Sequence, residues 1–97
     1  MQTFFMFGKY NTDAIKKISS ERTRKVVNTI QEMGGRVKSV YALLGNSDLI
    51  FIVNLPNPAT ATMVSITLTK MTGISFTTSV AIPVDEFDSM FNKGHKK

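Results

Sequence analysis

The chain has 97 residues, a formal net charge of +5, no cysteine, no tryptophan and a single histidine. This length suits one domain with one core, and without cysteine the chain has no disulfide, thiolate nucleophile or cysteine-ligated metal. Its longest apolar runs, residues 4–7 and 49–53, are far shorter than the ~20 residues of a membrane-spanning helix, and no secretory signal pattern opens it, so we expect a cytoplasmic protein.

The positive charge is concentrated in two places. One group lies in a C-terminal tail, and the other lies on a stretch that is expected to be helical. The residues are Lys93, Lys96 and Lys97 in the tail, and Lys16, Lys17, Arg22, Arg24 and Lys25 on the helix. A charge run of this kind is more typical of a solvated helix face than of a binding patch, so the pattern disfavours a nucleic-acid partner.

In chain order, residues 3–10 come first; they are rich in aromatic side chains and predict a strand. Ser20 is expected to cap a main helix over residues 21–33, because a serine oxygen there can accept from the first free amides of the helix. Gly34-Gly35 then predicts the helix end.

The middle and the end of the chain contain three more predicted strands. Residues 36–44 and 48–55 are rich in β-formers, and residues 45–48 between them have the composition of a tight hairpin connection. Residues 74–82 alternate apolar and polar side chains, which predicts a strand with two different faces.

The segment between residues 58 and 73 carries mixed signals. Apolar residues alternate with polar ones along residues 64–69 as in a strand, and threonine is a poor helix former. Asn57-Pro58 is nevertheless a helix start signal and Gly73 a stop signal, so we predict a helix. The order β-α-β-β-α-β then predicts an α+β protein with a ferredoxin-like fold, in which a four-stranded antiparallel sheet carries two helices on one face.

The second face of such a sheet is the main clue to function. An antiparallel sheet with one wet face normally alternates apolar and polar residues, but residues 4–7 and 49–53 are apolar on both faces. A bare face of this kind would exceed the apolar patches usual on monomers. We therefore expect the same face of a second copy to cover it, in a homodimer or a higher oligomer, with an apolar ligand or another protein as the alternative.

A short C-terminal helix is expected after the last strand. Val84, Phe87 and Phe91 recur at spacings of three and four, and acidic residues occupy the first turn, where the helix dipole favours negative charge. We expect this helix to dock on the sheet edge or on a partner subunit, beside Lys9 and Tyr10.

Several segments together resemble a known family. They are Lys9-Tyr10, "MGGRVKSVYALLG" at residues 33–45, the hairpin from Gly45 to Asp48, "LTKMTGISFTTSVAIP" at residues 68–83 and "DEF" at residues 85–87. With these segments in the family's order, the chain resembles the GYD domain family of the dimeric α/β-barrel group. The resemblance implies a single domain over residues 1–91 with a basic tail at residues 92–97, pairing of two copies into a dimeric α/β barrel, and no established reaction.

One position departs from the family's name motif, in which a tyrosine directly precedes the hairpin aspartate. Gly45 and Asp48 match the motif, but Ser47 stands in the place of that tyrosine. A role for a tyrosine hydroxyl at this position therefore does not carry over to this chain.

Six residues are candidates for ligand binding. They are Lys9, Tyr10, Tyr41, Asp48, Thr77 and Ser79. Lysine and tyrosine at a strand end can bind an anion or transfer a proton, and the small hydroxyl residues suit either close packing or a cavity wall. Asp48 is interpreted mainly as a turn residue that accepts from backbone amides. His95 is the only histidine and has no partner ligands in its tail, so we expect no metal site.

These observations favour a small homo-oligomeric binding or accessory protein with a small-ligand cavity between its subunits, and they require no cofactor. A cofactor-free barrel enzyme, isomerase-like or monooxygenase-like, stays open as an alternative, so the sequence leaves open whether the protein is an enzyme. A nucleic-acid binder is a weaker alternative, because residues 48–55 do not resemble the aromatic strand of an RNA-recognition module.

Overall fold

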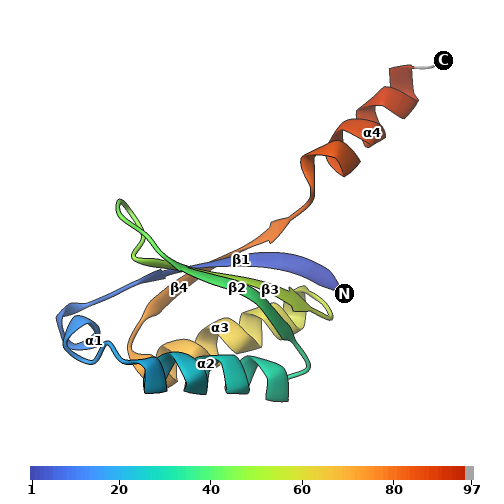
Figure 1. The fold of residues 1–97 in the computed structure, drawn as a ribbon. Coiled ribbons are helices and arrows are strands. Elements are labelled where there is room, and N and C mark those ends of the chain that lie inside the picture. Colours follow the sequence, from blue (N-terminus) through green and yellow to red (C-terminus); the bar gives the residue numbers. More distant parts are fainter. Residues whose placement is uncertain (96–97) are drawn as a thin grey trace.

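The computed structural model describes residues 1–95, with side chains described to residue 92. Its elements in chain order are β1 (Gln2–Lys9), α1 (Thr12–Lys16), α2 (Ser20–Glu32), β2 (Arg36–Ala42), β3 (Leu49–Leu55), α3 (Pro58–Thr72), β4 (Ser75–Ala81) and α4 (Val84–His95). The four strands form one antiparallel sheet in the order β2-β3-β1-β4. Figure 1 shows α1, α2 and α3 below this sheet, which confirms the predicted ferredoxin-like arrangement.

The hydrophobic core lies between the sheet and the two long helices α2 and α3. Strands β1 and β3 are central and contribute the largest buried side chains, while each helix contributes one apolar stripe. The core residues are Phe4, Met6, Val26, Ile30, Phe51, Val53, Leu55, Ala61, Val64 and Leu68. Removing these side chains from water supplies most of the driving force for the fold, at roughly 25 cal/mol for each Å² of apolar surface.

Helix α2 begins one residue earlier than predicted. Ser19, not Ser20, is the N-cap, because its backbone is extended and its hydroxyl accepts a hydrogen bond from the Arg22 amide at 3.0 Å. Both serines are good capping residues, so the sequence alone does not distinguish them. The helix ends at Glu32 with Met33 as its C-cap, and the chain then turns at Gly34, whose φ of +92° lies in the left-handed region that glycine adopts without strain.

The predicted helix over the threonine-rich segment is confirmed as α3. Asn57 caps it by accepting from the Thr60 amide at 2.8 Å, and Gly73 ends it at a φ of 77°. Its hydroxyl side chains donate to the carbonyl four residues earlier, as Ser65 does to Ala61 at 2.9 Å and Thr69 does to Ser65 at 2.9 Å. These bonds satisfy the hydroxyl groups within the helix, so the threonines are accommodated despite their low propensity.

Helix α4 forms as expected but lies at the other end of the sheet from the expected position. The register pairs Ala81 with Thr3 and Ser75 with Lys9, so β4 ends beside the start of β1, far from Lys9 and Tyr10. Within one chain, the expected place beside Lys9 and Tyr10 is therefore wrong, because β4 runs antiparallel to β1. The helix continues to His95, so the predicted boundary at residue 91 falls inside it.

Candidate ligand-binding face of the sheet

The sheet face that the helices leave uncovered carries a central apolar strip. Along β1 the side chains of Phe4 and Met6 point into the core and are buried, so the alternating Phe5 and Phe7 point to the opposite face, where they are half-buried. The register places Phe5 beside Ile52 and Phe7 beside Ile50 on the neighbouring strand β3. We call these four residues, Phe5, Phe7, Ile50 and Ile52, the apolar strip. The Phe5 and Phe7 rings meet edge to face with centroids 6.4 Å apart.

Hydroxyl residues border the apolar strip on both outer strands. On β4, Thr77 pairs with Phe7 and Ser79 pairs with Phe5. On β2, Tyr41 pairs with Ile50 and Ser39 pairs with Ile52. In the strand order β2-β3-β1-β4, this face therefore has two rows of side chains, Tyr41-Ile50-Phe7-Thr77 and Ser39-Ile52-Phe5-Ser79. Each row has polar residues at its two ends and apolar residues in its centre. The outer residues of a row are three strand spacings apart, about 14 Å at the usual interstrand distance.

The hydroxyl groups on this face are available to a ligand. Those of Ser39, Tyr41, Thr77 and Ser79 make no hydrogen bond to any of the described residues, and the Tyr41 side chain is 57% exposed. On the opposite face, by contrast, the Thr78 hydroxyl is paired with that of Ser65 at 2.6 Å. Serine and threonine thus have different environments on the two faces of β4.

A β-bulge on β2 determines the direction of Tyr41. Val37 pairs with Val53 and packs against the core, whereas Ser39 pairs with Ile52 on the uncovered face, because the register shifts between them. Without this shift, strict alternation would place residues 37, 39 and 41 on the same side. The bulge therefore turns Tyr41 away from the helices and toward the apolar strip.

The other three candidates lie together at one end of the sheet. The Lys9 ammonium donates to the carbonyl of Asn46 at 2.9 Å, and the Tyr10 amide donates to the Asp48 carboxylate at 2.8 Å. The Arg22 guanidinium lies 5.3 Å from the centroid of the Tyr10 ring, within the range of a cation–π contact. The hairpin between β2 and β3 is thus attached to the end of β1.

Asp48 is the centre of this attachment. Its amide donates to the Gly8 carbonyl and its own carbonyl accepts from the Leu43 amide, each at 2.8 Å. Its carboxylate accepts from Tyr10, which follows β1, and not from the amides of its own turn. The side chain therefore holds two strands in register at the rim of the sheet.

Replacing Asp48 with alanine is expected to lower the free energy of unfolding by roughly 0.5–2 kcal/mol, because the half-buried Tyr10 amide loses its acceptor. Asp48→Asn retains an acceptor oxygen in the same place and is expected to lose less. Urea titration of the two variants beside the parent protein measures the difference. Equal stability of Asp48→Ala and the parent protein would contradict this role.

The six candidate residues therefore form two groups. Tyr41, Thr77 and Ser79 border the apolar strip, and Lys9, Tyr10 and Asp48 occupy one end of the sheet. The residues that sequence reasoning did not single out are the strip itself and Ser39. The sequence did indicate an apolar second face, because residues 4–7 and 49–53 are apolar on both faces. Which of these residues lie on the uncovered face depends on the pairing register of the strands.

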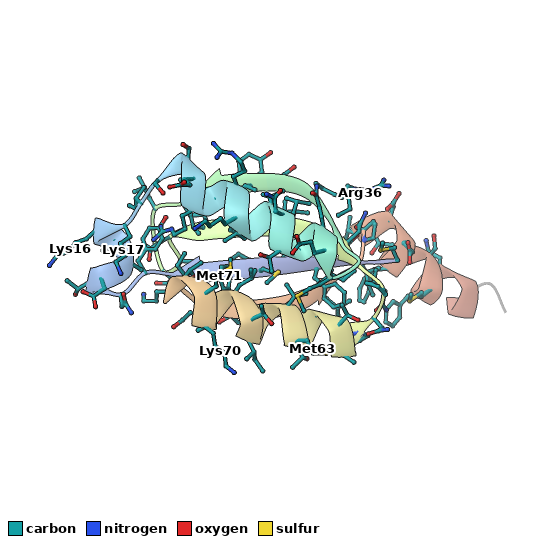
Figure 2. The ribbon with its side chains drawn as sticks, turned by 90° about the horizontal axis from the view of Figure 1, so that it is seen from below. Lys16, Lys17, Arg36, Met63, Lys70 and Met71 are labelled. Atoms are coloured by element: carbon teal, nitrogen blue, oxygen red, sulfur yellow. The ribbon has the colours of Figure 1, made fainter. Side chains whose placement is uncertain are left out.

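Neither a metal site nor a membrane span is found in the described part of the chain. No three histidine, cysteine, aspartate or glutamate side chains among these residues are placed to hold a metal ion. His95 has no described side chain. None of the helices in residues 1–95 is long and apolar enough to cross a membrane. Figure 2 shows Lys16 and Lys17 at the α1 end of the helical layer.

Comparison with protein families identifies the chain. Residues 4–91 match the model of the GYD domain family. The chain belongs to the GYD domain family. No curated protein matches it significantly.

Two solved structures share the fold of this GYD domain. One is the leucine response regulatory protein of Mycobacterium tuberculosis, with a TM-score of 0.61 and 10% identity over 84% of this chain and 51% of that one. The other is a hypothetical protein of Pyrococcus horikoshii, with a TM-score of 0.52 and 24% identity over 86% of this chain and 92% of that one. The GYD chain thus spans about half the length of the first protein and nearly all of the second. At these identities the likeness concerns the fold.

Proposed function

We propose that this GYD domain is a small homo-oligomeric binding protein. Two copies pair through their uncovered sheet faces, and the resulting barrel holds a small ligand between the two apolar strips. The ligand is mainly apolar, with hydrogen-bonding groups near its ends. The cytoplasmic location expected from the sequence stays a prediction.

The observation that carries this proposal is the polar–apolar–apolar–polar order of the rows across the uncovered face. An apolar centre of this kind is unfavourable in water, and a second identical face covers it with no other component. The hydroxyl groups at both margins then lie where a ligand between the sheets could reach them. Ligand sites in proteins are usually apolar cavities with a few such polar groups.

The same face favours binding over catalysis. The apolar strip has no polar side-chain atom, and proton transfer requires an acid or base within hydrogen-bond reach of the reacting group. Lys9 and the Asp48 carboxylate lie at the end of the sheet and are hydrogen-bonded to backbone groups. Among the four residues that border the strip, Tyr41 has the only ionisable side chain, so a cofactor-free enzyme acting at the strip would have to rely on it.

Mass measurement in solution tests the proposal. Light scattering at micromolar concentration should give at least twice the 10.8 kDa mass of the chain. Native mass spectrometry of the same sample should show a further small mass on the oligomer that disappears on denaturation. A species of only 10.8 kDa at these concentrations would overturn the pairing. An oligomer that carries no added mass and binds no member of a library of small apolar acids and alcohols would overturn the proposed ligand binding.

A further inference from the structure

Helix α4 presents an apolar side to solvent. Val84, Phe87 and Met90 recur at intervals of three and are 72%, 46% and 54% exposed. Figure 1 shows the helix projecting from the end of β4, away from the sheet and the other helices, with its axis on the uncovered side of the sheet. An amphipathic helix of 12 residues is marginal in water without a surface to pack on. Its sequence is therefore suited to contact with another surface.

A groove of matching character lies between α3 and the edge strand β4, on the helical side of the sheet. Its main hollow measures about 370 Å³ and is lined by Phe4, Phe76 and Val80 from the sheet and by Pro58, Thr62 and Ile66 from the helix region. Ile66 and Val80 are 53% and 55% exposed. A second hollow of about 190 Å³ continues the groove past Ile66 and Phe76 to Lys70. We call this the α3–β4 groove.

The charges of the first turns of α4 and of the folded body are complementary. Helix α4 has its three acidic residues, Asp85, Glu86 and Asp88, near its start and its one lysine, Lys93, near its end. Residues 1–83 contain nine lysines and arginines against four aspartates and glutamates, a formal charge of +5. The acidic first turns of α4 are therefore attracted to the folded body, and the basic residue of the α3–β4 groove is Lys70 at its far end.

Chain connectivity favours the groove of a second copy over that of the same chain. Val84 follows Val80 by four positions, so in its own groove the acidic first turn of α4 would remain at the Val80 end. Lys70 lies 12 positions beyond Pro58, or about 18 Å along α3. Figure 2 shows Lys70 on the side of α3 that faces away from α2. A helix from another copy has no such tether, so its acidic turn can lie beside Lys70.

We propose that α4 of one copy occupies the α3–β4 groove of a second copy, with its acidic first turn beside Lys70. The helix leaves the sheet on the uncovered side, which is the side where the second copy packs in the proposed function (Figure 1). The inference rests on that pairing and adds a contact that the pairing of two sheet faces does not require.

Site-specific cross-linking tests this contact, because the chain has no cysteine of its own. A tagged Met90→Cys protein is mixed with an untagged Ile66→Cys protein and treated with a short bis-maleimide. The expected product contains one chain of each kind, identified by its intermediate mass. Met90→Cys mixed with Lys16→Cys is the matched control and should give at least ten times less mixed product, since Lys16 lies on α1, away from the groove. Each variant alone reports cross-links between identical chains.

Charge reversal adds a test that acts between chains. Lys70→Glu in the Ile66→Cys chain should reduce the mixed product severalfold, and Asp85→Lys in the Met90→Cys chain should restore it. A chain that carries both Met90→Cys and Ile66→Cys tests the alternative. A cross-link within this single chain, with no mixed product in the mixing experiment, would place α4 in its own groove and overturn the proposal. So would the absence of both products. Light scattering of the same samples separates the two proposals, since an oligomer without this cross-link contradicts only the placement of α4.

Discussion

Replacing Phe7 with glutamate is expected to leave the protein monomeric at concentrations where the parent chain is paired. Phe7 is one of the four residues of the apolar strip and lies beside Ile50 on one side and Thr77 on the other. A carboxylate at this place would be buried without a partner when two faces close, and an unpaired buried charge is strongly unfavourable. We expect the dissociation constant to rise at least about 100-fold, which corresponds to roughly 2.7 kcal/mol.

The matched control is Ile18→Glu, which also places a charge on an exposed apolar residue. Ile18 is 60% exposed and lies between α1 and α2, away from the uncovered face. Light scattering across a dilution series should show a monomer for Phe7→Glu and an unchanged oligomer for Ile18→Glu, with circular dichroism confirming that both are folded. A folded Phe7→Glu oligomer would show that the strip is not the interface.

The sequence predicted the arrangement of the sheet well because its signals are local. Apolar residues without alternation in β1 and β3 indicate strands that are apolar on both faces, and the alternation in β4 indicates a strand with two different faces. The helical state of α3 was also predictable, but only from its ends. Its interior alternates like a strand, and the hydroxyl-to-carbonyl bonds that accommodate it are visible only in the structure.

The composition of the candidate site was less predictable, because it depends on pairing between distant segments. The bulge between Val37 and Ser39 turns Tyr41 to the uncovered face. The strand contains no glycine or proline that would predict a bulge from the sequence. The acceptor role of Asp48 was predictable from its residue type. Its donor, the Tyr10 amide, lies 38 positions away, and only the close approach of the hairpin to the end of β1 brings the two together.

Truncating Phe51 is expected to have the largest effect on the stability of the single chain. Phe51 is 2% exposed, and its ring meets that of Phe76 at 6.0 Å in an edge-to-face contact. Phe51→Ala leaves a cavity that the helices packed against it cannot fill, so the free energy of unfolding should fall by about 3–5 kcal/mol. For a chain of this length, whose total stability is about 5–15 kcal/mol, this loss approaches unfolding.

The neighbouring residue Ile52 provides the comparison, since it belongs to the apolar strip and not to the core. Pairing stabilises a folded chain by mass action, so the thermal midpoint of the parent protein should rise with protein concentration. Phe51→Ala should lower the midpoint at every concentration and keep that dependence, whereas Ile52→Asp should abolish the dependence with a smaller loss at high dilution. Thermal melts over a hundredfold range of concentration distinguish the two. The two faces of β3 are assigned separate roles, since Phe51 stabilises the single chain and Ile52 contributes to the contact between chains. An equal loss of the concentration dependence of the thermal midpoint in both variants would contradict this assignment.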